Sequence, residues 1–209
     1  MQGGSVQPRL AAHGLEVSRA DRVLFSGLSF DVEPGSVLLV EGRNGSGKTT
    51  LLRTIAGLRY PDAGEVTWCG EPVTEGALAG ELVWIGHLPG IKDDLTVLEN
   101  LAMARALGSP TGMTPEEAVE VVGLVECEDR QAKHLSAGQR RRVALARLLL
   151  VQARLWILDE PYTSLDREAV RFVEGLITEH VAAGGLVVMT AHQDVRLPGV
   201  PLARIDLSS

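Results

Sequence analysis

Hydrophobic positions along the chain recur with two different periods, which predict buried strands and amphipathic helices in alternation. Short apolar runs bounded by turn residues are typical of buried strands. These runs occupy 36–42, 65–68, 81–86, 154–159, 185–191 and 203–207. In 167–182 apolar residues recur on one helical face, and a shorter helix is expected over 48–56, ended by Gly57. Because strands and helices alternate at both ends of the chain, we expect a parallel sheet covered by helices.

The pattern changes in the middle of the chain, where the signals over 96–150 are helical. Thr96-x-x-Glu99 and Thr114-Pro115-x-Glu117 are both patterns that start helices. The segment 15–32, near the N-terminus, predicts antiparallel strands joined by turns. We therefore expect an α/β fold with a mainly parallel sheet core, an antiparallel β flank and a helical subdomain. The expected division is a single domain over 1–209, with the core in 1–95 and 151–209 and the helical subdomain in 96–150.

Composition and charge exclude several classes of protein. The 209 residues are 45% hydrophobic and 22% charged, which is typical of a globular protein. The net charge of −7 argues against nucleic acid as a partner, because nonspecific binding to phosphates depends on positive charge. We expect Cys69 and Cys127 to be reduced thiols, since they lie far apart and lack metal-site spacing. With no signal peptide and no apolar run of membrane-spanning length, we expect no transmembrane segment.

The stretch GRNGSGKT matches the P-loop pattern completely, and it stands between an expected strand and an expected helix. Glycines let the backbone wrap closely around phosphates, lysine places a positive charge on them, and a threonine hydroxyl is a hard ligand for Mg²⁺. A glycine-rich turn without a ligand is the alternative, but pattern and context agree. The expected nucleotide-binding residues are Gly42, Arg43, Asn44, Gly45, Ser46, Gly47, Lys48, Thr49 and Thr50.

The stretch LWILDEP supplies acidic groups at the end of an apolar strand. Asp159 is expected to hold Mg²⁺ together with Thr49, and Glu160 is placed to polarise the attacking water. Alone, an acidic strand end would be unremarkable, but the P-loop upstream changes that interpretation. With Lys48, the expected catalytic residues are Glu160 and His192, which follows the strand at 185–191 and could reach a γ-phosphate.

The stretch LSAGQ precedes three arginines and an apolar helix. Ser136 and Gln139 fit a capping box, which needs no ligand, but Ser136, Gly138 and Gln139 also suit an anion at a helix start. We expect the three arginines, 140–142, to face solvent or adjacent acidic groups and to have no catalytic role. TSLD, ending at Asp166, follows the acidic strand end closely.

The chain contains, in this order, the P-loop, a helical insert ending in LSAGQ, LDEP, SLD and a histidine. This ordered set resembles the ABC-type ATPases over essentially the whole chain. The resemblance implies a head-to-tail homodimer with two ATP molecules at its interface. Ser136, Gly138, Gln139 and Asp166 of one chain would then meet ATP held by the P-loop of the other. The cofactors implied are ATP and Mg²⁺, and the reaction is hydrolysis of ATP to ADP and phosphate.

Two departures from the family pattern narrow the resemblance. His87 stands where most relatives have a glutamine that binds Mg²⁺, and Arg19 stands where many stack an aromatic ring on adenine. With GHLPGIKDDLTVLENL and MTAHQ, the chain resembles the ATP-binding subunits of heme exporters in cytochrome c biogenesis.

That resemblance implies a peripheral protein on the cytoplasmic side of the bacterial inner membrane. Its expected partners are integral membrane subunits that handle heme and contact 88–94. Another exporter, for lipoproteins or peptides, and a soluble ABC ATPase of cofactor assembly remain as alternatives.

Overall fold

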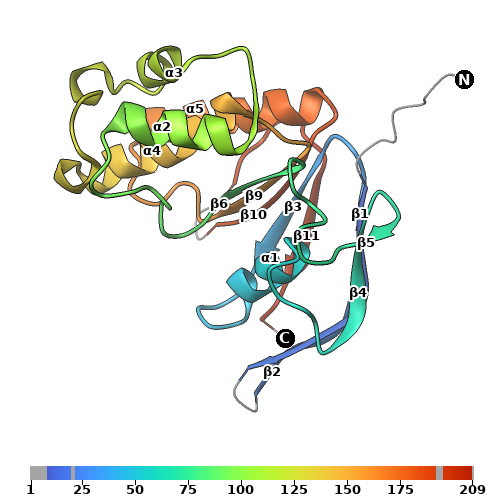
Figure 1. Ribbon diagram of the computed structural model, residues 1–209. Coiled ribbons are helices and arrows are strands. Elements are labelled where there is room, and N and C mark those ends of the chain that lie inside the picture. The colour runs from blue at the N-terminus through green and yellow to red at the C-terminus, as the bar shows by residue number, and fades with distance from the viewer. Residues whose placement is uncertain (1–8, 20–21, 192–194, 209) are drawn as a thin grey trace, which may run out of the picture.

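The computed structural model describes residues 9–19, 22–191 and 195–208, and its centre is a parallel sheet (Figure 1). Its five strands follow the order β11-β3-β10-β9-β6, and every neighbouring pair is parallel. The strands are β3 (Ser36–Glu41), β6 (Leu82–Ile85), β9 (Leu155–Asp159), β10 (Leu186–Thr190) and β11 (Leu202–Asp206). β3, β9 and β10 are almost wholly buried, which explains their continuous apolar runs. The predicted parallel core is confirmed.

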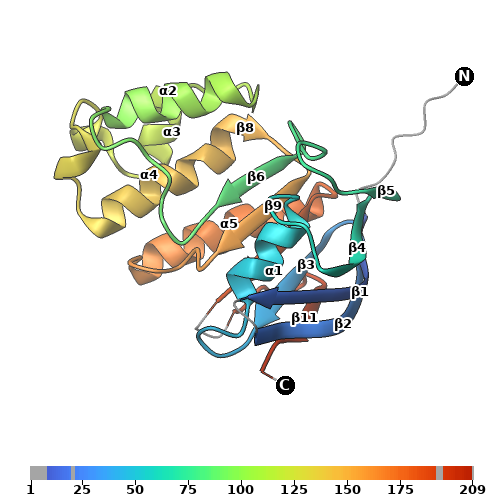
Figure 2. The ribbon, with the colours of Figure 1, turned by 60° about the horizontal axis from the view of Figure 1, so that its bottom comes forward.

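A second, antiparallel sheet forms the flank predicted from the N-terminal segment. Its strands follow the order β2-β1-β4-β5. They are β1 (Leu10–Arg19), β2 (Arg22–Val32), β4 (Ala63–Trp68) and β5 (Glu71–Pro72). Figures 1 and 2 show this sheet beside α1 (Lys48–Ile55), which lies between the two sheets. Apolar residues of both sheets and of α1 form one core cluster, so the antiparallel sheet is packed onto the parallel-sheet core.

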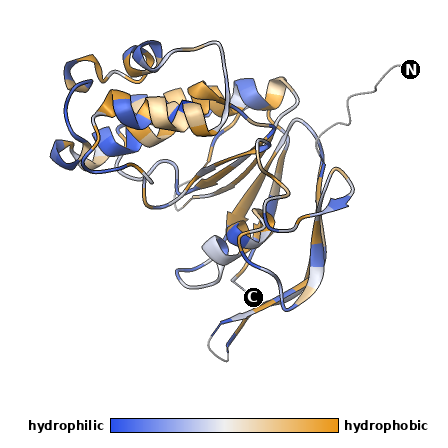
Figure 3. Ribbon diagram, viewed as in Figure 1, coloured by the Kyte–Doolittle hydropathy of each residue, from blue (hydrophilic) through white to orange (hydrophobic). Residues whose placement is uncertain are grey.

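The opposite face of the parallel sheet is covered by α5 (Arg167–Ala182), whose bounds match the predicted helix. Its buried residues Val173, Ile177 and Val181 pack in a second core cluster with side chains of β3, β9 and β10. Figure 3 shows the resulting concentration of apolar residues in the central strands. The parallel sheet is therefore covered on both faces, as expected.

The middle of the chain is helical and has a core cluster of its own. It contains α2 (Val97–Leu107), α3 (Pro115–Val121) and α4 (Ala137–Leu150), with the short 3₁₀ turns Val125–Cys127 and Ala132–His134. Each of the three α-helices starts with a capping box, at Thr96, Thr114 and Ser136, so the predicted starts are confirmed. A short antiparallel pair of β7 (Ser109–Pro110) and β8 (Val151–Gln152) closes this part and was not predicted. In the ranges that the structure describes, no helix is both long and apolar enough to cross a bilayer.

Candidate active site

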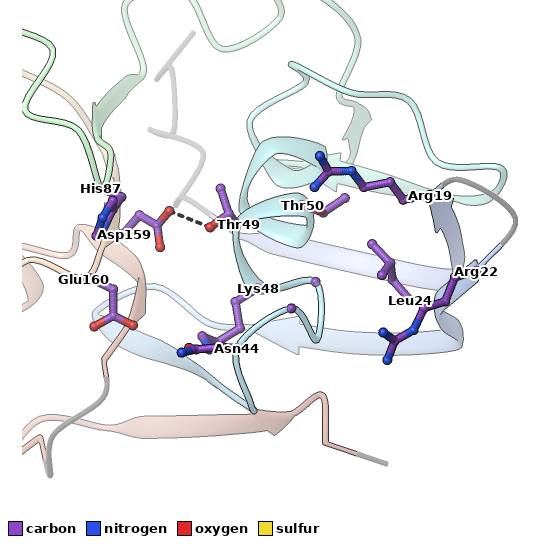
Figure 4. Close-up of a pocket in the computed structure, with 12 residues that line it drawn as sticks. Arg19, Arg22, Leu24, Asn44, Lys48, Thr49, Thr50, His87, Asp159 and Glu160 are labelled. Carbon is purple, nitrogen blue, oxygen red and sulfur yellow. Dashed lines mark hydrogen bonds between the residues drawn. The ribbon is translucent and has the colours of Figure 1, made fainter.

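The P-loop curves between β3 and α1 with its lysine turned inward (Figure 4). Gly42, Gly45 and Gly47 have φ of 143°, 80° and 105°, a backbone region that favours glycine. A Cβ at Gly47 would lie 3.2 Å from Leu24 Cβ, so the loop also needs glycine for space. Lys48 Nζ donates to the carbonyl oxygens of Gly42 at 2.7 Å and Arg43 at 3.3 Å. The ammonium group thus lies within the curve of the loop, beside the start of α1, where anions are stabilised.

Thr49 and Asp159 meet across the site although they lie far apart in sequence. Thr49 Oγ1 donates to Asp159 Oδ2 at 2.8 Å, as Figure 4 shows. The other carboxylate oxygen of Asp159 accepts from Thr190 Oγ1 at 2.8 Å. Asp159 is buried, so its carboxylate orientation is fixed by β10 on one side and the P-loop helix on the other. A hydroxyl and a carboxylate oxygen side by side are the hard ligands that Mg²⁺ prefers, and the residues therefore fit the expected ion.

Glu160 leaves β9 in a strained backbone conformation. Its φ is 53°, in the left-handed region that glutamate rarely adopts. The Glu160 amide donates to Thr190 Oγ1 at 2.9 Å, so the same hydroxyl holds both acidic residues. In Figure 4 the carboxylate faces the site below His87 and opposite Lys48. Strain of this kind is characteristic of positions where geometry serves a function.

These side chains line a cavity of about 570 Å³. Its lining residues are Arg19, Arg22, Leu24, Asn44, Gly45, Gly47, Lys48, Thr49, Thr50, His87, Asp159 and Glu160. The structure therefore brings together most residues predicted for the nucleotide and the metal. Gly42, Arg43 and Ser46 belong to the same loop but do not line the cavity. His192 lies outside the described residues.

Sequence reasoning missed Arg22 and Leu24. Arg22 pairs with Arg19 at the end of the β1–β2 hairpin, which brings both arginines to the cavity. Arg22 and Leu24 are two positions apart on β2, so they share one face of the strand. The alternation of side chains along β2 could have indicated Leu24 as a partner of Arg22, because both residues lie on the same face of the strand.

The LSAGQ stretch does not line this cavity in its own chain. Ser136 Oγ accepts from the Gln139 amide at 3.2 Å, and Gln139 Oε1 accepts from the Ser136 amide at 2.9 Å. Gly138 lies against the Ser164 carbonyl, which a Cβ would approach to 2.9 Å. Asp166 caps α5 by accepting from the Ala169 amide, and that bond, with the Arg142 charge, lowers the pKa of Asp166.

One expectation about the three arginines is wrong. Arg140 and Arg142 do pair with carboxylates, of Asp93 and of Asp166. Arg141, in contrast, is only 3% exposed and points into the protein rather than to solvent or to an acidic side chain at the surface. The reason is that its guanidinium reaches backbone carbonyls at the ends of β6 and β9, a partner that a helix pattern cannot reveal.

The family model described as "ABC transporter" matches residues 25–163, which include the P-loop, LSAGQ and the acidic strand end. The chain belongs to the ABC transporter family. Among its relatives is the cytochrome c biogenesis ATP-binding export protein CcmA of Nitrosococcus oceani, 47% identical over 91% of this chain and 89% of that protein. The protein of the same name from Escherichia coli is 45% identical over 95% of this chain and 96% of its own length.

A solved structure agrees with this assignment. A putative ABC transporter ATP-binding protein from Pyrococcus furiosus superposes with a TM-score of 0.80 and 27% identity, over 95% of this chain and 97% of that one. An ABC protein of this kind binds nucleotide and hydrolyses ATP, which accounts for the P-loop, the acidic strand end and the cavity between them. It also explains why the helical segment 96–150, which contains LSAGQ, interrupts the alternating strands and helices.

Proposed function

We propose that this ABC protein is the ATP-hydrolysing subunit of a membrane complex that exports or transfers heme for the maturation of c-type cytochromes. The observation that carries the proposal is a likeness of 44–47% to cytochrome c biogenesis ATP-binding export proteins over 90–99% of this chain. This likeness extends well beyond the ABC motifs. Heme as cargo follows from the resemblance to heme exporters, carried by His87, Arg19 and the segment around 86–101.

In the proposed site, Lys48 and the amides of the P-loop hold the β- and γ-phosphates of ATP. Thr49 and Asp159 would hold Mg²⁺, since their oxygens lie 2.8 Å apart and form a hard-ligand pair. The ion supplies charge neutralisation at the phosphates when it is bound. Arg19 stacks its guanidinium plane on the adenine, and Leu24 adds an apolar surface at the same end of the cavity.

Glu160 acts as the general base that orients and deprotonates the attacking water. Its backbone conformation, held from Thr190, supports this role because it fixes the carboxylate toward the cavity. His192 is proposed to contact the γ-phosphate. His87 lines the cavity on the side of the two acidic residues, which suits an imidazole that orients a water molecule there.

A second copy of the chain completes the site in this proposal. Ser136, Gly138, Gln139 and Asp166 bind the ATP held by the partner's P-loop. Their position supports it, because these residues lie apart from the cavity of their own chain and three of them form the start of α4 or its cap. In the free chain the capping box satisfies Ser136 and Gln139, and phosphate oxygens replace those contacts in the dimer.

The complex is proposed to contain integral membrane subunits that contact 88–94, with this chain as a peripheral protein on the cytoplasmic side of the inner membrane. Two features support the contact. Leu88 is 79% exposed and offers an apolar side chain to a partner. A groove of about 340 Å³ lies next to it, lined by Gly90, Ile91 and apolar residues of β6 and α2. The helical subdomain 96–150 would move with this contact.

Complementation of a deletion strain tests the function. The wild-type gene should restore c-type cytochromes, whereas genes carrying Lys48→Ala or Glu160→Gln should not, because ATP turnover is the proposed output. Heme-stained gels and difference spectra measure c-type cytochromes, and b-type hemes should stay at normal levels. Arg53→Ala is the matched control, since Arg53 is an exposed cation on the same helix as Lys48 and should complement fully. Normal c-type cytochromes in the deletion strain would remove the heme role.

A further inference from the structure

The buried guanidinium of Arg141 has a set of partners that packing alone does not require. Its Nε donates to the Pro161 carbonyl at 3.1 Å, and its Nη1 donates to the Gly86 carbonyl at 2.7 Å. Its Nη2 donates to the carbonyls of Asp159 at 3.0 Å and Glu160 at 2.6 Å. One side chain of α4 therefore binds four backbone oxygens on two other segments.

The four acceptors lie at the catalytic edge of the parallel sheet. Asp159, Glu160 and Pro161 form the turn by which the chain leaves β9. Gly86 follows β6 and directly precedes His87. Both segments place side chains in the nucleotide cavity, while the Arg141 side chain itself does not line it. Arg141 therefore acts on cavity residues only through their backbone.

The contact with Glu160 matters most, because the backbone there is strained. Glu160 is held at φ 53° from both sides: its amide donates to Thr190 Oγ1 at 2.9 Å, and its carbonyl accepts from Arg141 at 2.6 Å. The same carbonyl also accepts from the Thr163 amide at 3.3 Å, so without the Arg141 donor it keeps only this longer bond. The residue can then relax toward an ordinary right-handed or extended conformation, which turns the carboxylate away from its direction.

Burying a guanidinium group is unfavourable unless the group is paired and hydrogen-bonded. Burial lowers the pKa of Arg141, and the nearby charges of Asp159 and Glu160 only partly offset that shift. A lysine could not replace it, because one ammonium cannot reach four carbonyls arranged around a planar fork. An apolar side chain would pack but would leave four carbonyls without this donor.

We propose that Arg141 is a positioning residue for ATP hydrolysis: it holds Glu160 and the segment before His87 in register with the start of α4. This rests on the proposed role of Glu160 as general base. Because α4 begins at the LSAGQ stretch, the same guanidinium links the start of that helix to the backbone of Asp159 and Glu160.

A double-mutant cycle on the full-length chain tests the proposal. The variants are Arg141→Gln, Glu160→Gln and the two combined, with Arg171→Gln, an exposed arginine of α5, as control. Single-turnover hydrolysis and nucleotide affinity are measured for each. Arg141→Gln should lower the hydrolysis rate by about tenfold or more with nucleotide Kd changed by no more than about twofold. In the Glu160→Gln background the same change should cause little further loss, since the group that Arg141 positions is gone.

The outcomes separate the two roles. Activity of Glu160→Gln at the wild-type level would refute the general base, and the positioning role would fall with it. If Glu160→Gln is inactive but the two losses multiply, Glu160 keeps its role and the Arg141 inference is wrong. Thermal unfolding shows whether Arg141→Gln folds; if it does not, Arg141→Lys decides, because it keeps the charge and loses most of the fork. Wild-type hydrolysis by Arg141→Lys would overturn the proposal.

Discussion

At the scale of single residues, His87 brings an imidazole to an edge of the cavity that is otherwise formed by oxygen-bearing side chains. Figure 4 places it beside Asp159 and above Glu160. Imidazole nitrogen is a poor ligand for Mg²⁺, so His87 is expected to act through a water molecule and not on the ion directly.

His87→Gln should therefore keep ATP hydrolysis within about twofold of wild type, because an amide oxygen is a ligand that Mg²⁺ accepts. His87→Ala should lower kcat by about tenfold while nucleotide affinity changes little, since the lost group orients water and not the phosphates. Steady-state hydrolysis and equilibrium nucleotide binding measure the two effects. Equal kcat for His87→Ala and wild type would show that His87 is only a loop residue.

Local spacing explains which residues of the site could be predicted. The P-loop and the acidic strand end are each contiguous in sequence, so Lys48 and Glu160 carry their own signal. Arg22 reaches the cavity only through the register of a hairpin, and Arg141 is buried only because carbonyls of two remote strand ends surround it. The local sequence around either arginine carries no signal for its place, because tertiary packing alone brings Arg22 to the cavity and buries Arg141.

At the scale of elements, α5 and β9 are joined by a stacked ring pair. The rings of His180 and Trp156 lie 3.9 Å apart between centroids with an interplanar angle of 7°. The ring also covers Gly185, where a Cβ would approach His180 Nε2 to 2.3 Å, so the contact requires glycine at the start of β10. Burial lowers the pKa of His180 from 6.5 to about 4. The neutral ring is thus the form that fits between the helix and the sheet.

This pair predicts a pH dependence of stability. Between pH 4 and 6.5 the unfolded chain binds a proton at His180 that the folded chain does not, so stability rises with pH through this window. From pH 7 to pH 5 the contribution lost should be about 2 kcal/mol. Urea denaturation at both values measures it. His180→Phe keeps the stack and should show a correspondingly smaller fall, whereas an identical fall in both proteins would contradict the assignment.

Elements with a capping box or a continuous apolar run were predicted well, and the very short strands β7 and β8 were not. Thr96, Thr114 and Ser136 all cap their helices, because a capping box is a contact within four residues. The antiparallel pair β7–β8 joins two residues at 109–110 with two at 151–152, and one of them is a proline. Strands this short carry no periodicity, so only the packing of α2 against α4 brings them together.

At the scale of the whole molecule, the proposed dimer predicts that a bulky side chain at the start of α4 prevents two chains from associating. In the Glu160→Gln background, ATP should favour the dimer, because hydrolysis no longer releases it. Adding Ser136→Arg should prevent association by placing a long side chain where the partner's phosphates are expected. Light scattering measures the mass with and without ATP. Ser109→Arg, the same change at an exposed serine of β7, should leave association intact.

A monomer in both variants would argue against association of the free chain, and a dimer in the Ser136→Arg protein would argue against the proposed interface.

The overall architecture was predictable because the order of its motifs is specific to one family. The burial of Arg141 in α4 was not, because it depends on how that helix packs on the sheet.

The paired arginines at the hairpin end of the cavity have a consequence for inhibitor selectivity. Where many ABC ATPases present a neutral aromatic face to the base, the proposed base site of this chain presents the guanidinium groups of Arg19 and Arg22. An adenine analogue that carries a carboxylate on its ring would form charge-assisted hydrogen bonds with these arginines. In a relative with an aromatic ring at this place, the same carboxylate would lose its water without gaining such a bond. Adenine analogues with a carboxylate are therefore a rational starting point for ligands that discriminate this ATPase from relatives with an aromatic residue at that place.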